Sequence, residues 1–390
     1  MKDIVIVSAV RTPVGSLNGS LSSHSAPRLG SIAIAEAVKR AGLRGEEINE
    51  VIMGSVLSAG QGQAPARQAC LGAGLPRSVG CTTVNKVCGS GLKAVILAAQ
   101  AIHTGDAEVV VAGGMESMSN APYLLERART GYRMGHGKLI DCMIRDGLWD
   151  VYNDFHMGMG AELCAEEFRI SRDEQDSFAI TSYSRAQNAQ KGGSFVKEIV
   201  PVTPVNGKGP VVAEDEEVKK FDAEKLKALR PAFKDGGSVT AGNASSVSDG
   251  GAALVVMAEE RAKKLGRKPL ARVIGWNGFS REPEWFTIAP AEAISGLAEK
   301  TGYSLSDIDL FEINEAFAVS SIAVNRKLGL NPEKVNVRGG AVALGHPIGA
   351  SGARILVTLI HSLIDLDKRR GIASLCIGGG EALALMVERV

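Results

Sequence analysis

The sequence predicts an α/β fold in which strands and helices alternate around a largely parallel sheet. Short runs rich in β-branched residues alternate with segments whose apolar residues recur at helical spacing. Glycine accounts for 46 of the 390 residues and clusters in short runs, which favours tight turns and close backbone approach. The segments at Cys88 and Val111 resemble those at Gly349 and Cys376, at offsets of 261 and 265 residues. Two pairs of similar segments in the same order, at nearly the same offset, suggest that half of the fold is duplicated.

The first 115 residues alternate short β-branched runs with amphipathic or wholly apolar segments, as βαβ units do. In chain order we expect a strand at Ile4–Val10, a helix at Leu29–Ala41, strands at Val51–Val56 and Thr82–Val84, a helix at Gly91–Ile102 and a strand at Val109–Ala112. The second of these helices is almost wholly apolar, and Val109–Ala112 is expected to be a buried strand.

The middle of the chain, residues 119–248, lacks this alternation of strands and helices. It carries every aromatic residue that precedes position 250. Charged helices are expected near Ala161–Phe168 and Arg172–Lys191, and the polar stretch Lys208–Lys220 is expected to be a loop. We interpret it as a long segment that leaves the first α/β unit and returns to it, and segments of this length are usually functional. We therefore divide the chain into an N-terminal half (1–118 plus 249–268), a loop domain (119–248) and a C-terminal half (269–390).

The strand–helix rhythm resumes at Pro269. Strands are expected at Ala271–Trp276, Ile308–Glu312, Val335–Val337, Ile372–Ile377 and Ala382–Val387, and helices at Ala291–Thr301, Ala316–Lys327 and Ala350–Ile364.

Composition argues against several classes of function. Lys plus Arg is 44 and Asp plus Glu is 43, so a net charge of +1 gives no reason to expect nucleic acid or a membrane surface as a partner. No run approaches the roughly 18 apolar residues of a transmembrane helix, so none is expected. The six cysteines form no CxxC pair, which favours a reducing cytoplasm. Without a ligand cluster or a dinucleotide fingerprint, we expect no metal and no redox cofactor.

Cys88 is the first candidate catalytic residue. It lies in Asn85-Lys-Val-Cys88-Gly-Ser-Gly, where a strand ends and an apolar helix begins. The N-terminal end of a helix lowers the pKa of a thiol and so favours a nucleophilic thiolate. The alternative is a buried structural cysteine, unless a base is found elsewhere.

His346 supplies a candidate base. It precedes the second glycine-rich helix start, in Gly345-His346-Pro-Ile-Gly349-Ala-Ser-Gly. Two related turns from the two halves would bring Cys88 and His346 together, and a Cys/His pair is the minimal activated nucleophile. The alternative is a phosphate-binding turn with an incidental histidine.

Two further residues are candidates for a reaction that removes a proton from carbon. Cys376 ends a β run and is followed by Ile-Gly378-Gly-Gly, whose glycines suggest exposed N–H groups at an active site. Simple hydrolysis needs only one nucleophile, so a second reactive thiol is better explained as the acid and base for a carbon acid. Asn314 lies between a strand and a helix, where it is either an N-cap or an amide that polarises a carbonyl or a water. For Cys376 the alternative is a small buried strand residue.

Taken together, the motifs VCGSG (Cys88), NEAF (Asn314), GHPIGASG (His346) and CIGGG (Cys376) occur in the order seen in thiolases. GGMESMSNAPY, FHMG, RPAF and TAGNASSVSDGGAA extend the similarity over essentially the whole chain. The chain resembles the biosynthetic type of this family, the acetyl-CoA acetyltransferases. The resemblance implies two duplicated βαβαβαββ halves in αβαβα layers, with a loop domain inserted in the N-terminal half.

The resemblance also implies a mechanism. Cys88 loses its proton to His346 and takes the acetyl group of acetyl-CoA, and Cys376 removes a methyl proton from a second acetyl-CoA, so that acetoacetyl-CoA forms. His346 and a water held by Asn314 would bind the enolate oxygen. The N–H groups of Cys88 and Gly378 would bind the oxygen of the acetyl-cysteine.

Coenzyme A is expected as substrate and product rather than as a bound cofactor. By resemblance it would contact Leu148, His156, Met157, Lys220, Phe233, Ala241, Ser245, Ala316 and Phe317. The family also suggests a homodimer or homotetramer with contacts near residues 119–140. Phe286 stands near the acyl pocket, where many bacterial members have methionine.

Three alternatives stay open at this point. A degradative 3-ketoacyl-CoA thiolase with a broader chain-length range more often has Gln-Cys-Ser-Ser-Gly around the first cysteine. A condensing enzyme that acts on acyl-carrier protein usually has histidine in place of the second cysteine. A catalytically silent lipid- or CoA-binding protein of thiolase fold would not need all four catalytic positions.

Overall fold

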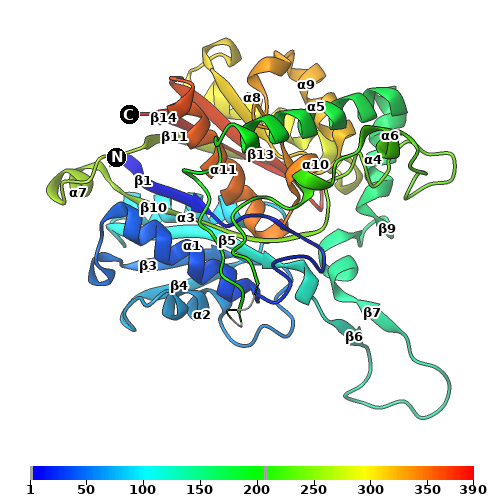
Figure 1. The fold of residues 1–390 in the computed structure, drawn as a ribbon, viewed down its shortest axis with the longest axis horizontal. Helices are drawn as coiled ribbons and strands as arrows, with labels where there is room; N and C mark the ends of the chain where they lie inside the picture. Colours follow the sequence, from blue (N-terminus) through cyan, green and yellow to red (C-terminus); the bar gives the residue numbers. More distant parts are fainter. Residues whose placement is uncertain (1–2, 206, 208) are drawn as a thin grey trace.

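A mixed ten-stranded sheet organises the chain in the computed structural model, which describes residues 3–205, 207 and 209–390 (Figure 1). The strand order is β12-β13-β14-β11-β1-β10-β5-β3-β4, with β2 paired to β10. The strands are β1 (Ile4–Arg11), β2 (Gly15–Ser16), β3 (Glu50–Gly54), β4 (Gly80–Val84), β5 (Val109–Ser117), β10 (Ser248–Ala258), β11 (Ala271–Ser280), β12 (Leu310–Ile313), β13 (Arg370–Ile377) and β14 (Glu381–Arg389).

The expectation of a largely parallel sheet is wrong. Only β3–β4, β3–β5 and β12–β13 are parallel, and the other pairings of this sheet are antiparallel. The reason lies in the connections. A tight turn folds β14 back beside β13, and the long middle segment returns β10 antiparallel to β5. Neither connection is the helical crossover that parallel neighbours need.

The predicted duplication is confirmed by the order of elements in the two halves. In the first half β1, α1 (Ala26–Ala41), β3, α2 (Pro65–Gly72), β4, α3 (Ser90–Thr104), β5 and β10 occur in this order. In the second half β11, α8 (Ala289–Thr301), β12, α9 (Ala318–Leu328), α11 (Ile348–Asp365), β13 and β14 take the same places, except that β4 has no counterpart among the strands of the sheet. The halves meet where β1 pairs with β11, at Val5–Arg272 and Ile6–Ala271.

The strand predicted at Val335–Val337 is wrong. Val335 makes only one parallel bridge, to Phe311 of β12, at the place where β4 pairs with β3 in the other half. Asn336 then adopts φ 46°, a left-handed conformation that ends the extended segment.

Five layers result from this arrangement. Helix α1 and α2 (Pro65–Gly72) cover the outer face of the first half, and α8 with α9 (Ala318–Leu328) covers that of the second half. Helices α3 and α11 lie between the two halves of the sheet and pack against both it and each other.

This central position explains why two helical segments are so apolar. Val87–Thr104 and Ile348–Asp365 are long and apolar enough to span a membrane by length and composition alone, but 56% and 89% of them is buried inside the protein, as in core helices.

The middle segment is inserted between β5 and β10, where the second half has only the turn Gly378–Gly380 between β13 and β14. It contains the hairpin of β6 (Tyr123–Leu125) and β7 (Leu139–Asp141), which projects away from the sheet (Figure 1). Its other elements are the π-helix η3 (Met143–Leu148), the pair β8 (Trp149–Asp150) and β9 (Phe155–His156), and the helices α4 (Met157–Glu167), α5 (Arg172–Lys191) and α6 (Ala223–Lys227).

Two expectations concern this insert directly. Helix α5 has the predicted bounds and begins with a capping box between Ser171 and Glu174. The stretch expected to be a loop ends in a short 3₁₀ helix, Glu217–Lys220, while its first residue, 208, lies outside the described residues.

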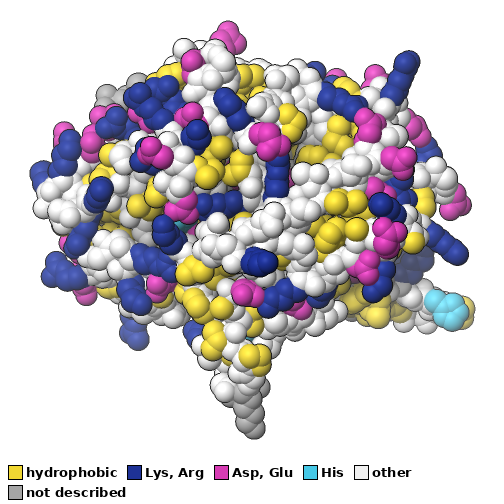
Figure 2. Space-filling model, turned by 45° about the horizontal axis from the view of Figure 1, so that its top comes forward, with side chains coloured by type: hydrophobic (Ala, Val, Ile, Leu, Met, Phe, Trp, Pro, Cys, Tyr) yellow, Lys and Arg dark blue, Asp and Glu magenta, His cyan; other side chains and the backbone are white. Residues whose placement is uncertain are grey.

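Basic and acidic side chains are intermixed on the face of the molecule seen in Figure 2.

The crossing of α3 and α11 generates a test of the fold. A Cβ added at Gly352 would lie 2.4 Å from the backbone nitrogen of Leu92, so the two helices would have to separate. We expect Gly352→Ala to lower the free energy of unfolding by about 1–3 kcal/mol, the usual cost of overpacking. Urea denaturation measures the change. The control is Gly80→Ala, whose Cβ would have no neighbour closer than 3.7 Å. Equal stability of the two variants would contradict the close crossing.

Candidate active site

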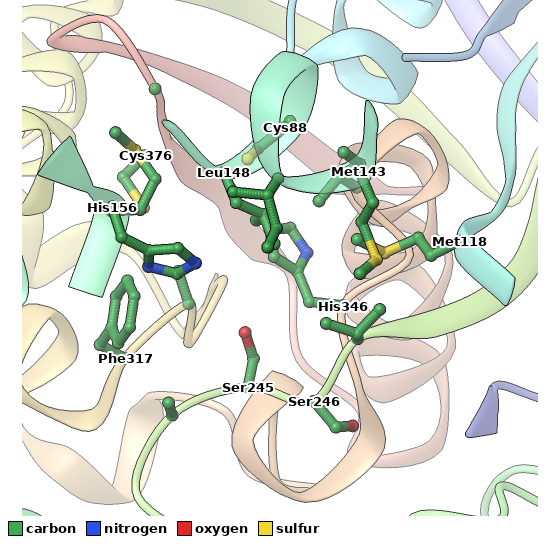
Figure 3. Close-up of a pocket in the computed structure, with 18 of the residues that line it drawn as sticks. Cys88, Met118, Met143, Leu148, His156, Ser245, Ser246, Phe317, His346 and Cys376 are labelled. Carbon is green, nitrogen blue, oxygen red and sulfur yellow. The ribbon is translucent and has the colours of Figure 1, made fainter. Parts of the chain in front are cut away.

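A cavity of about 290 Å³ opens where the two halves meet the insert. Cys88, His346 and Cys376 all line it, and His156 and Phe317 lie on the same side of the cavity as Cys376 (Figure 3). The lining residues are Cys88, Met118, Met143, Ile144, Gly147, Leu148, His156, Met157, Phe233, Ala244, Ser245, Ser246, Val247, Phe286, Ala316, Phe317, His346, Ile348, Cys376 and Gly378. The fold thus brings together the two cysteines and the histidine that the sequence analysis selected.

Cys88 is held by a tight turn between β4 and α3. Val87 adopts φ 46°, an unusual conformation for a β-branched residue and one of the kind that clusters at functional sites. The hydroxyl of Ser90 donates to the carbonyl of Val87 (2.6 Å) and accepts from the N–H of Lys86 (2.9 Å). These bonds close the turn and direct Cys88 into the cavity.

The expectation that the helix end lowers the pKa of the Cys88 thiol is wrong. Burial raises this pKa to about 11, although the N–H groups of Gly378 and of Cys88 itself point at the sulfur and act in the opposite direction. Desolvation outweighs the helix end because the thiolate is removed from water. Cys88 is therefore a neutral thiol that needs a base.

His346 has the properties of that base. Burial, followed by the positive charge of Arg354, lowers the pKa of the imidazole to about 3, so the ring is neutral. Its backbone N–H donates to the carbonyl of Ser246 (3.0 Å), and its Nδ1 lies 2.6 Å from the hydroxyl oxygen of Ser351. Nε2 is buried and has no hydrogen-bond partner among the described residues. It is therefore available for a proton.

Cys376 occupies the end of β13 and is 2% exposed. Burial raises the pKa of its thiol, and the nearby Cys88 acts in the same direction. The turn that follows depends on glycine, since Gly380 has φ 85° and its Cβ would lie 2.3 Å from the carbonyl oxygen of Arg281. This turn places Gly378 at the cavity, beside Cys88.

Asn314 lies behind His346 and follows β12. Its side-chain nitrogen is 3.5 Å from Nδ1 of His346, while its side-chain oxygen is buried without a partner in the part of the chain that the structure describes. The N-cap alternative is wrong because the residue that precedes α9 is Phe317. A buried amide oxygen without a partner suits a bound water.

The mouth of the cavity is formed by stacked aromatic residues of the insert and the C-terminal half. The rings of His156 and Phe233 are 4.8 Å apart and nearly parallel, and Phe233 meets Phe317 edge-on at 6.2 Å. Nδ1 of His156 accepts a hydrogen bond from the N–H of Gly158 (3.0 Å), so the ring has one orientation. These rings form an apolar part of the same cavity lining that includes Cys88 and Cys376.

Seven of the nine predicted coenzyme A contacts line the cavity, and Ala241 and Lys220 do not. Ala241 is exposed. The ammonium group of Lys220 instead contacts Ser16 (2.5 Å), Glu217 (3.2 Å) and Glu216 (3.4 Å). The sequence analysis missed Met118, which belongs to the GGMESMS motif, and Met143, for which no sequence signal was available.

Glu116 is a further residue that the sequence analysis missed. It ends the segment Val111–Glu116, which resembles the segment that begins at Cys376 in the C-terminal half. Its buried carboxylate accepts hydrogen bonds from the N–H groups of Val56 (3.0 Å), Leu57 (3.2 Å) and Gly349 (2.9 Å). Gly349 belongs to the first turn of α11, so Glu116 of the N-terminal half anchors the helix that follows His346. Burial raises the pKa of Glu116 to about 7.

Comparison with known families covers almost the whole chain. The family model of the thiolase N-terminal domain matches residues 4–260, and that of the thiolase C-terminal domain matches residues 267–389.

Similar curated proteins and solved structures cover the chain from end to end. Acetyl-CoA acetyltransferase 2 of Arabidopsis thaliana is 56% identical, over 99% of this chain and 97% of its own. Acetyl-CoA acetyltransferase of Cupriavidus necator is 52% identical over 100% of both chains. The crystal structure of the Bacillus anthracis acetyl-CoA acetyltransferase has a TM-score of 0.98 at 45% identity, covering 100% of this chain and 99% of its own. The Acat5 thiolase from Ascaris suum, in complex with coenzyme A, has a TM-score of 0.95 at 46% identity, over 100% of both chains.

The raised pKa of Glu116 predicts a pH-dependent contribution to stability. This pKa rises from its ordinary value of 4.5 to about 7 in the folded protein, so the folded state binds the proton more tightly than the unfolded state. The resulting stabilisation is complete below the unfolded pKa and is lost as the pH rises through the folded pKa. We expect the free energy of unfolding of the wild type, relative to Glu116→Gln, to fall between about pH 5 and pH 8. Urea titrations at the two pH values measure it, and a constant difference would contradict the assignment.

Proposed function

Because the chain belongs to the thiolase family, we propose that it catalyses the reversible Claisen condensation of two acetyl-CoA molecules to acetoacetyl-CoA and CoA. As an acetyl-CoA acetyltransferase it would pass through an acetyl-cysteine intermediate. The observation that carries this proposal is the meeting of two thiols, the half-buried Cys88 and the buried Cys376, with a neutral imidazole in one apolar cavity, to which each half of the fold contributes.

In the first step the thiol of Cys88 transfers its proton to Nε2 of His346 and attacks the thioester carbon of acetyl-CoA. The N–H groups that point at the sulfur of Cys88, those of Gly378 and of Cys88, are placed to donate to the thioester oxygen as it gains charge. One such donor typically contributes about 3–4 kcal/mol. The CoA thiolate leaves and takes the proton of the Cys376 thiol, so an acetyl-Cys88, an imidazolium and a Cys376 thiolate remain.

In the second step the Cys376 thiolate removes a proton from the methyl group of a second acetyl-CoA. Nε2–H of the His346 imidazolium and a water on Asn314 donate to the enolate oxygen. The enolate carbon then attacks the acetyl group, and Cys88 leaves as a thiolate that recovers its proton from His346. Each of the three residues returns to its starting protonation state, so the cycle closes with no metal or redox cofactor.

Coenzyme A is proposed to enter past the insert, with its pantetheine arm along Leu148, His156, Met157, Phe233, Ser245, Ala316 and Phe317. The apolar lining of the cavity and the stacked rings of His156 and Phe233 in it support this path. Ala241, which is exposed, remains a proposed contact near the adenine end. Lys220 is a weaker candidate for the CoA phosphates because it already contacts two glutamates.

A homo-oligomeric state, dimer or tetramer, is also part of the proposal. The projecting hairpin exposes large apolar side chains, among them Tyr123, Leu125, Met134 and Leu139, and such residues suit a contact with a second copy. The free thiols of the six cysteines support a reducing compartment, for which we propose the cytoplasm.

The roles of the two cysteines are separable by experiment. Cys88→Ala should abolish both the acetyl adduct seen by intact mass after mixing with acetyl-CoA and the thiolysis of acetoacetyl-CoA, followed by its enolate absorbance. Cys376→Ser should still become acetylated, but condensation should fall by about 10²–10⁴-fold, the usual size of a general acid–base contribution. It should also lose the exchange of acetyl-CoA methyl protons with solvent deuterium. His346→Ala should impair both steps.

Cys70→Ala, in the distant helix α2, is the control and should retain both steps. Acetylation of Cys88→Ala together with failure of Cys376→Ser to acetylate would reverse the two roles.

The position of Phe286 leads to a prediction of which acyl group the enzyme prefers. Its buried ring lines the cavity and lies 6.4 Å from the ring of Phe317, so it forms a flat, rigid wall close to the reacting groups. We expect acetoacetyl-CoA to be the best thiolysis substrate and a 2-methyl branch to be tolerated. The measurement is kcat/KM for acetoacetyl-CoA, its 2-methyl derivative and long-chain 3-ketoacyl-CoA. A higher kcat/KM for the long chain would favour the degradative 3-ketoacyl-CoA thiolase instead.

A further inference from the structure

The hydroxyl of Ser351 makes two short contacts beside the catalytic imidazole. Ser351 lies in the first turn of α11 and is fully buried. Its Oγ is 2.9 Å from the carbonyl oxygen of Pro347 and 2.6 Å from Nδ1 of His346. Both contacts are within hydrogen-bond distance, so the single hydroxyl proton has to be assigned to one of them.

Only one assignment makes both contacts hydrogen bonds. A carbonyl oxygen only accepts, so the contact with Pro347 is a hydrogen bond only if Ser351 donates to it. The contact with His346 then requires a proton on Nδ1, donated to Oγ. A neutral imidazole carries one proton, so Nε2 is left with its lone pair and faces the cavity without a partner in the described chain.

The duplicated half supports this assignment independently. Ser90 occupies the corresponding place at the start of α3, and its hydroxyl also donates to the carbonyl of the preceding turn, at Val87 (2.6 Å). Its oxygen accepts the N–H of Lys86 (2.9 Å). With the proton of His346 on Nδ1, Ser351 matches this pattern: it donates to the carbonyl of Pro347 and accepts from the N–H of the imidazole.

We propose that Ser351 is a positioning residue that keeps a proton on Nδ1 of His346, so that Nε2 alone gains and loses the catalytic proton. The proposal deepens and rests on the proposed function. Before the reaction the bond selects the tautomer that accepts the proton of Cys88. After proton transfer, the same bond stabilises the imidazolium, which holds Nε2–H toward the enolate oxygen.

The other groups around the imidazole do not replace this bond. The side-chain nitrogen of Asn314 makes the longer contact with Nδ1, at 3.5 Å, and an amide N–H has nothing to donate to once Nδ1 is protonated. Arg354 on the same helix adds positive charge and opposes the imidazolium. Glu116 contacts the backbone of α11, and Cys88 and Cys376 are neutral thiols. Ser351 is therefore the close acceptor that the imidazolium has.

Ser351→Ala tests the proposal, with Ser362→Ala as the matched control. Ser362 is also a buried serine of α11, and its hydroxyl has no hydrogen-bond partner among the residues described. The full-length protein, labelled with ¹⁵N-histidine, is measured without substrate by NMR, because ring-nitrogen shifts distinguish protonated from unprotonated nitrogen. His346→Asn identifies the signals of His346. The wild type and Ser362→Ala should show a protonated Nδ1 and an unprotonated Nε2, whereas Ser351→Ala should shift the proton toward Nε2.

The kinetic readout is the single-turnover rate of Cys88 acetylation. Ser351→Ala should slow it by about 10- to 100-fold, as expected for loss of one hydrogen bond to a charged group, and Ser362→Ala should leave it unchanged. A wild-type His346 with its proton on Nε2, or a Ser351→Ala protein that acetylates at the wild-type rate, would overturn the proposal. A wild type that has the expected tautomer but is not acetylated would instead overturn the proposed function.

Discussion

The close crossing of α3 and α11 is the constraint on which the site depends. Each helix presents a glycine to the other: a Cβ on Gly91 would lie 2.8 Å from the nitrogen of Ala353, and a Cβ on Gly352 would lie 2.4 Å from that of Leu92. Cys88 precedes the first helix and His346 precedes the second, so the distance between the helix starts determines whether the thiol and the imidazole can meet. Duplication placed related turns on both sides, and the two glycines allow them to approach.

Desolvation determines how these groups react. Burial raises the pKa of the Cys88 thiol to about 11 and lowers that of the His346 imidazole to about 3, so both are neutral before substrate binds. In such a site a proton moves between protein groups and substrate rather than to solvent, and hydrogen bonds to developing charge are strong because water is scarce. The same burial makes an orienting partner for the imidazole necessary.

The insert completes the cavity and is held to the sheet by a buried ionic cluster. Arg11 of β1 donates to Glu198 (2.6 Å) and to both carboxylate oxygens of Asp215 (2.7 and 2.8 Å), and both acids belong to the insert. Removing one partner of such a cluster leaves an unpaired buried charge, which typically costs about 3–5 kcal/mol. The wall that carries His156 and Phe233 is therefore connected to the same strand that joins the two halves.

The sequence by itself determined the duplicated α/β halves and made Cys88, His346, Cys376 and Asn314 candidates, because helix starts, glycine turns and strand ends are encoded by neighbouring residues; the roles predicted for them came from the resemblance to the thiolase family. It did not determine the antiparallel return of β10 beside β5, nor the raised pKa of Cys88, nor the contacts of Glu116 with Gly349. These depend on which residues far apart in the chain surround a group once it is buried. Only the tertiary structure decides that environment, because strand direction follows from the path of the insert and the pKa of a group follows from the water it loses.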